Sequence, residues 1–168
     1  MKIQLSGIVN DSIVDGEGIR MTIFTQGCPH HCPDCHNPQT HSFMGGYEAD
    51  TDKILSMMSE NPLLDGITLS GGEPMQQPEA CYILAEGAKK LNLNVWVYTG
   101  YTWEELLKKN NPSIQKLLQK TDILIDGRFI ASLRSLELAF KGSSNQRTID
   151  VQKSLLQNHI ILYKKNVN

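Results

Sequence analysis

The sequence predicts an α/β fold in which a parallel sheet forms an incomplete, open (β/α) barrel. Two observations predict the parallel sheet: short apolar segments alternate with helical patterns along the chain, and four polar or glycine-rich motifs each follow one of these segments. With 168 residues, the chain is too short for the eight units of a closed barrel. We expect one domain over residues 1–168, because no linker-like stretch interrupts the sequence.

Strands are expected where apolar residues form short segments bounded by turn signals. These segments are 20–24, 66–69, 94–98, 122–125 and 160–163. Their order, with helical patterns between successive segments, favours a parallel sheet with right-handed crossovers.

Three helical patterns lie between these segments. The first, "DKILSMMSE", can be capped by Asp50 or Thr51, and the second, "PEACYILAEGAKKL", begins with Pro78, which suits a first helical turn. The third, "TWEELLKKN", is interrupted near Pro112 before "SIQKLLQK" resumes it. Cys81 lies on the apolar stripe of the second pattern, so we interpret it as a small buried core residue.

The motifs that follow the strands should meet at one edge of the sheet. The cysteine loop follows the strand ending at Phe24, "SGGEP" follows Leu69, "TGY" follows Tyr98, and "DGRF" follows Ile125. Sites on parallel sheets form at the carboxyl ends of the strands. We therefore expect the functional site at this edge.

The amino-acid composition limits the classes of binding partner that we expect for this protein. Apolar residues make up 40% and charged residues 20%, and the formal charge is −2 from 16 basic and 18 acidic side chains. This charge gives no reason to expect a nucleic acid or an anionic membrane as a partner. The chain has no apolar stretch of membrane-spanning length and no signal-peptide pattern at its start, so we expect a cytoplasmic protein that acts on a small molecule or another protein.

The segment "GCPHHCPDCHNP", 27–38, concentrates three cysteines in eight residues. Reduced thiols at such spacing suit a metal better than disulfides. A zinc ion could be completed by His31 or His36, although His36 would have to bend back beside its neighbouring cysteine. An iron-sulfur cubane held by three thiolates would instead leave one iron open for an exchangeable ligand.

The spacing resembles that of a known superfamily. "CPHHCPDC" matches the C-x-x-x-C-x-x-C pattern of the radical S-adenosylmethionine enzymes, and "SGGEP" resembles their glycine-rich segment. The resemblance implies a [4Fe-4S] cluster held by Cys28, Cys32 and Cys35, with the amino and carboxylate groups of S-adenosyl-L-methionine on the open iron. Glycines suit the second motif because a backbone without Cβ can approach a ligand closely.

A narrower resemblance follows. "DGEGIRMTIFTQGCPHHCPDCHNP" is similar to the entry segment of glycyl-radical activating enzymes, and "DGRF" with "KGSSNQR" resembles the activating proteins of anaerobic ribonucleoside-triphosphate reductase. This implies an oxidoreductase that reductively cleaves S-adenosyl-L-methionine to a 5'-deoxyadenosyl radical and generates a glycyl radical on the large subunit of anaerobic (class III) ribonucleotide reductase. The implied electron donor is reduced flavodoxin or a ferredoxin-type protein.

The same resemblance implies the cofactor-binding residues, while no side chain is expected to act as a catalytic acid, base or nucleophile. The expected cofactor contacts are Asp34, Cys35, His36, Ser70, Gly71, Gly72, Glu73, Thr99 and Asp126. Asp34 stands where many members carry an aromatic residue near the adenine, so backbone around Cys35 and His36, or apolar residues elsewhere, are the other candidates for that contact. Glu73 could instead cap a helix, and Thr99 and Asp126 are also common turn residues.

Several alternatives stay open at this point. The chain could activate another glycyl-radical enzyme such as pyruvate formate-lyase, although activases of that enzyme carry additional sequence, or it could be a non-catalytic zinc-binding or redox-sensing module. Two loops could border the site or be ordinary turns; they contain Asp15, Gly16, Gly18 and Arg20 in one, and Asn145, Gln146 and Arg147 in the other. His159 is interpreted as structural.

Overall fold

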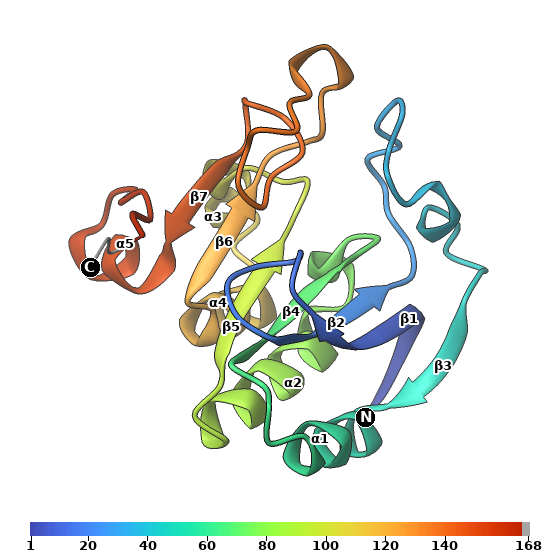
Figure 1. Cartoon of the computed structure of the whole chain (residues 1–168). Coiled ribbons are helices and arrows are strands. Elements are labelled where there is room, and N and C mark those ends of the chain that lie inside the picture. Colours follow the sequence, from blue (N-terminus) through green and yellow to red (C-terminus); the bar gives the residue numbers. More distant parts are fainter. Residues whose placement is uncertain (166–168) are drawn as a thin grey trace.

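The computed structural model describes residues 1–165, which fold around one mixed β-sheet (Figure 1). Along the sheet the strand order is β3-β1-β2-β4-β5-β6-β7. The strands are β1 (Lys2–Ser12), β2 (Arg20–Thr25), β3 (Tyr47–Asp50), β4 (Gly66–Gly71), β5 (Asn94–Tyr98), β6 (Ile123–Asp126) and β7 (Arg147–Asp150).

The centre of the sheet is parallel, as the sequence predicts. β2 pairs with β4, β4 with β5, and β5 with β6, all in parallel. The edges differ from the prediction: β1 is antiparallel to both β2 and β3, and β7 is antiparallel to β6. The expectation of a parallel sheet is therefore confirmed for four strands and wrong at both edges.

The segment 160–163, predicted as a strand, forms only an isolated bridge in which Leu162 faces Ile149. It nevertheless runs beside β7, because the Asp150 N–H donates to Ile161 O at 2.9 Å and the Tyr163 N–H donates to Thr148 O at 2.8 Å. The Tyr163 hydroxyl also donates to Glu17 Oε2 at 2.9 Å. This segment thus joins β7 to the loop between β1 and β2.

The first two of the five helices in residues 1–165 begin where the sequence predicts, at Asp50 and at Pro78. The helices are α1 (Thr51–Glu60), α2 (Pro78–Lys90), α3 (Trp103–Lys108), α4 (Pro112–Lys120) and α5 (Val151–Gln157). Asp50 caps α1, and Thr102 forms a capping box with Glu105 at α3. Asn111 accepts from the N–H groups of Ser113 and Ile114, so the interruption near Pro112 is the start of α4.

The two faces of the sheet have different roles. Helices α1, α2 and α4 lie along one face (Figure 1), and the main apolar core lies between them and the sheet. Since strand side chains alternate between faces, Val95 and Val97 enter this core, while Trp96 and Tyr98 join a smaller cluster on the opposite face. Cys81 on α2 is fully buried in the main core, as predicted.

No helix within residues 1–165 is long and apolar enough to cross a bilayer.

Candidate functional site

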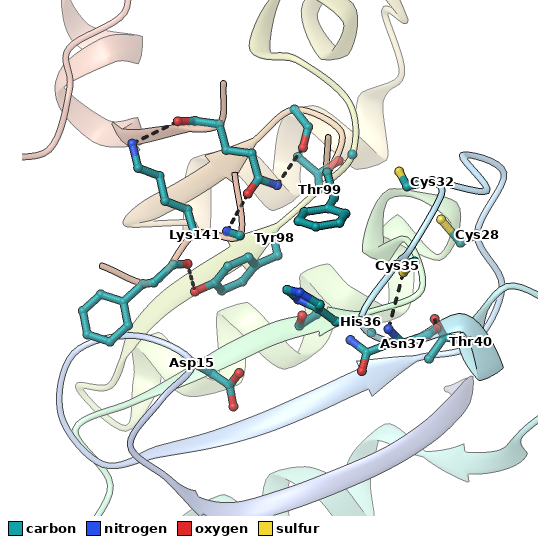
Figure 2. A pocket seen from close by; sticks show the side chains of 18 of the residues that line it. Asp15, Cys28, Cys32, Cys35, His36, Asn37, Thr40, Tyr98, Thr99 and Lys141 are labelled. Atoms are coloured by element: carbon teal, nitrogen blue, oxygen red, sulfur yellow. Dashed lines mark hydrogen bonds between the residues drawn. The ribbon is translucent and has the colours of Figure 1, made fainter. Parts of the chain in front are cut away.

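A cavity of about 770 Å³ opens at the carboxyl ends of the parallel strands (Figure 2). Residues from all four strand-end motifs line it, among them Cys28, Ser70, Thr99 and Gly127. The expectation that these motifs meet at one edge of the sheet is confirmed.

The three clustered cysteines line this cavity together. Cys28, Cys32 and Cys35 carry free thiols; the first is buried and the other two are half-buried. Figure 2 shows their sulfur atoms gathered on one side of the cavity, on the loop that follows β2. The loop has little regular structure, and few backbone hydrogen bonds hold it: the N–H of Cys28 donates to His41 O at 3.1 Å and that of Cys35 to Cys32 O at 3.2 Å.

Backbone N–H groups face two of these thiols, those of Cys28 and Cys35. Burial raises the pKa of the Cys28 thiol, and the backbone N–H groups of His30 and His31 act against this increase. The Asn37 N–H donates to Cys35 Sγ at 3.4 Å. Amide donors of this kind stabilise metal-bound thiolates and tune the reduction potential of iron-sulfur clusters. The donor set of three thiols with backbone N–H groups therefore fits an iron-sulfur cluster.

Within residues 1–165, no group of three His, Cys, Asp or Glu side chains surrounds a point where one metal ion could sit. A cubane does not need such a point, because each thiolate binds a different iron.

The glycine-rich turn after β4 also lines the cavity, through Ser70, Gly71 and Gly72. A Cβ on Gly71 would lie 2.5 Å from Thr25 N, and one on Gly72 would lie 2.5 Å from Gly27 O. Gly71 also has a φ of 96°. The glycines are thus required by close approach to the chain's own backbone at the end of β2 and just after it, a reason that the sequence does not reveal.

Glu73 is placed beneath the cavity and not on its wall. Its side chain is fully buried, and its two carboxylate oxygens face donors from three segments of the chain. Thr99 does line the cavity, but its hydroxyl donates to Glu73 Oε1 at 2.9 Å.

Asp126 is likewise buried and absent from the cavity wall. It accepts from the Trp103 N–H at 2.8 Å, at the start of α3, and from Arg147 Nε at 3.1 Å. Arg147 also pairs with Glu104. In this geometry Asp126 links α3 to β7.

Asp34 and His36 lie in different environments. Asp34 is exposed, has a φ of 56° and does not line the cavity. His36 lines the cavity, and its ring contacts that of Phe129 with centroids 4.8 Å apart. Phe129 and Phe140 are cavity residues that the sequence reasoning missed, because nothing in the pattern distinguishes them from core aromatics.

The loop between β1 and β2 borders the cavity, which is one of the two alternatives that the sequence left open. Asp15 lines it, with Oδ2 accepting from Thr22 Oγ1 at 3.0 Å. Arg20 is fully buried beneath this loop and donates to Thr68 Oγ1 at 2.7 Å and to Glu17 O at 2.8 Å. Arg20 therefore fixes the loop from below.

The loop 141–147 borders the cavity and is held by hydrogen bonds within the loop and to Gly127. Gln146 lines the cavity and donates to Gly127 O at 2.9 Å, while Lys141 donates to Gln146 O at 3.1 Å (Figure 2). Asn145 and Arg147, predicted with it, do not line the cavity. On the same side the Tyr98 hydroxyl donates to Phe140 O.

Comparison with known proteins identifies similar sequences over most of the chain. The family model "4Fe-4S single cluster domain" matches residues 14–149. The chain is 34% identical to the anaerobic ribonucleoside-triphosphate reductase-activating protein of Escherichia coli (strain K12), over 80% of this chain and 90% of that protein. It is 34% identical to the protein of that name from Salmonella typhimurium, with the same coverage, and 31% identical to that from Enterobacteria phage T4, over 80% of this chain and 85% of the phage protein.

Proposed function

Because this chain belongs to the family of anaerobic ribonucleoside-triphosphate reductase-activating proteins and carries the 4Fe-4S single cluster domain, we propose that it is a radical S-adenosyl-L-methionine activase. Its target is the large subunit of anaerobic ribonucleotide reductase, on which it generates a glycyl radical. The observation that carries the proposal is the single cavity lined by three free thiols and the turn of Ser70, Gly71 and Gly72. We interpret the parallel strands as an open barrel of the radical S-adenosyl-L-methionine type.

Cys28, Cys32 and Cys35 would hold the [4Fe-4S] cluster. When bound, the cluster would supply one electron for the cleavage of S-adenosyl-L-methionine to methionine and a 5'-deoxyadenosyl radical, and that radical would take a hydrogen atom from a glycine Cα of the reductase. Three thiolates leave one iron free for the cofactor. The N–H groups near Cys28 and Cys35 would stabilise their thiolates.

The remaining cavity residues would bind S-adenosyl-L-methionine. The turn of Ser70, Gly71 and Gly72 lines the same cavity as the three cysteines, and so do His36 and Thr99. The cavity of about 770 Å³ is within the range of cofactor sites. Direct contacts from Asp34, Glu73 and Asp126 remain sequence predictions, since none of the three lines the cavity.

The reductase would approach from the open rim of the cavity. Ile13, Val14 and Leu136 line the cavity and are 70%, 73% and 90% exposed. Apolar side chains at this rim would exclude water once a glycine-bearing segment of the reductase covers them. Reduced flavodoxin or a ferredoxin-type protein would supply the electron.

The test begins with anaerobic reconstitution of the chain with iron and sulfide. We expect a reduced-cubane signal in electron paramagnetic resonance that changes when S-adenosyl-L-methionine is added, and 5'-deoxyadenosine together with a glycyl radical when the reductase is present. Radical formation only on another glycyl-radical enzyme, such as pyruvate formate-lyase, would reassign the partner. One bound zinc without acid-labile sulfide would overturn the proposal.

The matched controls are two cysteine variants. Cys32→Ala should lose the cluster and all cofactor cleavage, because it removes a ligand. Cys81→Ala should keep both and lose on the order of 1 kcal/mol of stability, because this thiol only packs in the core. Equal iron loss in both variants would contradict the assignment of ligands.

A further inference from the structure

The buried carboxylate of Glu73 joins three segments of the chain. Oε1 accepts from the Met75 N–H at 3.0 Å and from Thr99 Oγ1 at 2.9 Å, and Oε2 accepts from the Gly100 N–H at 2.8 Å. The fourth partner is His30 Nε2, 2.8 Å from Oε2. A carboxylate offers about four acceptor positions, so these four partners leave no free position for a ligand.

His30 lies on the cysteine loop between Cys28 and Cys32, and its side chain is only 4% exposed. The other three partners of the Glu73 carboxyl group all donate to it, so we assign His30 Nε2 as the donor in this contact. The His30 ring also meets the Tyr101 ring edge-on, with centroids 4.5 Å apart. It packs so tightly on Gly100 that a Cβ there would lie 2.3 Å from His30 Cδ2.

These contacts hold a part of the cysteine loop that backbone hydrogen bonds do not hold. The backbone hydrogen bonds of the loop hold its two ends, at Gly27, Cys28 and Cys35, and not the segment 29–31. Within that segment, the His30 side chain contacts Glu73, Gly100 and Tyr101, which lie in the turns that follow β4 and β5. The backbone N–H of His30, together with that of His31, faces the Cys28 thiol.

We propose that His30 and Glu73 form a positioning pair, in which the buried carboxylate holds the His30 imidazole and thereby places the cysteine loop, and the N–H donors near Cys28, for the cluster. Glu73 in this arrangement does not touch the cofactor. The pair rests on the proposed function, because it acts on the cluster that the three cysteines would hold.

Histidine variants test the pair through cluster properties rather than turnover. In His30→Leu the ring volume is roughly kept but the donor to Glu73 is lost, whereas His30→Gln keeps an N–H donor of similar reach. His30→Asn carries the same amide one carbon shorter and cannot reach. His159→Leu is the control, since His159 is exposed and, within residues 1–165, its ring makes one hydrogen bond, with Gln157 O.

Each variant is reconstituted anaerobically, and its iron release to a chelator and its cluster midpoint potential are measured with and without S-adenosyl-L-methionine. Loss of a group that orients metal ligands typically weakens metal binding 10- to 100-fold. We therefore expect iron release about tenfold faster or more, and a shifted midpoint, for His30→Leu and His30→Asn. His30→Gln and His159→Leu should match the wild type.

Two results would overturn the positioning role of His30 and Glu73 and leave the proposed function intact. One is wild-type iron release and midpoint in His30→Leu. The other is equal damage in His30→Gln and His30→Asn, which would show that the hydrogen bond to Glu73 is not what matters. If His30→Leu does not fold, as judged by circular dichroism of the cluster-free protein, the comparison of His30→Gln with His30→Asn alone tests the role of the hydrogen bond to Glu73. Failure of the wild type itself to bind a cluster would instead overturn the proposed function.

Discussion

Replacement of Arg20 by methionine should strongly destabilise the fold. The Arg20 side chain is fully buried and donates to Thr68 Oγ1, Glu17 O and Ile67 O, with its guanidinium 5.3 Å from the centre of the Trp96 ring. Methionine keeps much of the length and the apolar packing but donates no hydrogen bond. Arg20→Met therefore isolates the contribution of the buried charge and its hydrogen bonds.

The expected size follows from two opposing effects. Hydrogen bonds from a charged group contribute about 1.5 to 3 kcal/mol each, so the three together contribute about 5 to 9 kcal/mol. Burial lowers the pKa of Arg20 from 12.5 to about 10. At neutral pH this lowering corresponds to a cost of about 3 kcal/mol for keeping the charge inside the fold, which the variant avoids. The net loss should be about 2 to 6 kcal/mol in the free energy of unfolding.

Urea unfolding of the cluster-free protein, followed by circular dichroism, measures this loss. Lys116→Met on α4 is the control, because Lys116 is exposed and its replacement should change the free energy by less than about 0.5 kcal/mol. A loss below about 1 kcal/mol for Arg20→Met would refute the reasoning, since it would mean that the hydrogen bonds do not outweigh the burial of the charge.

Two further predictions concern Gly100 and Glu104. Gly100→Ala should speed iron release to a chelator, because its Cβ would lie 2.3 Å from His30 Cδ2 and displace the ring; a wild-type rate would show that His30 can move without harm. Glu104 is held by Arg147, which lowers its pKa to about 2. Its contribution to stability is therefore complete above about pH 4.5 and is lost as the pH falls toward 2. Because Glu104 is 53% exposed, this contribution is at most about 1 kcal/mol. Urea unfolding at pH 5 and pH 3 should show a smaller loss for Glu104→Gln than for the wild type, and equal losses would contradict the role of this pair.

The central strands could be predicted because each is a short apolar segment with turn signals at its ends. The edge strands could not. β3 and β7 read "YEAD" and "RTID", and β1 mixes apolar with polar residues over its eleven positions. Short strands with charged residues are common at sheet edges, where the pairing partner rather than the local sequence decides the conformation.

The candidate site, like the sheet, could be predicted from the sequence only in part. Its place at the carboxyl edge of the sheet, and the meeting of Cys28 with Ser70 and Thr99, followed from the strand order alone. The direction of the Glu73 carboxylate did not, because it depends on donors from segments 43 and 27 residues away, at His30 and Gly100. Sequence patterns locate a motif, but tertiary contacts decide which of its side chains face a ligand.

The division of the sheet into two faces makes the fold and the cofactor site separable. The main core, between the sheet and helices α1, α2 and α4, uses side chains that point away from the cavity. The stabilising contacts of this core therefore survive whether or not a cluster is present. A chain that loses its cluster should stay folded and be able to bind a new cluster. Damage to the iron-sulfur cluster could then be reversed by inserting a new cluster, without synthesis of a new protein chain.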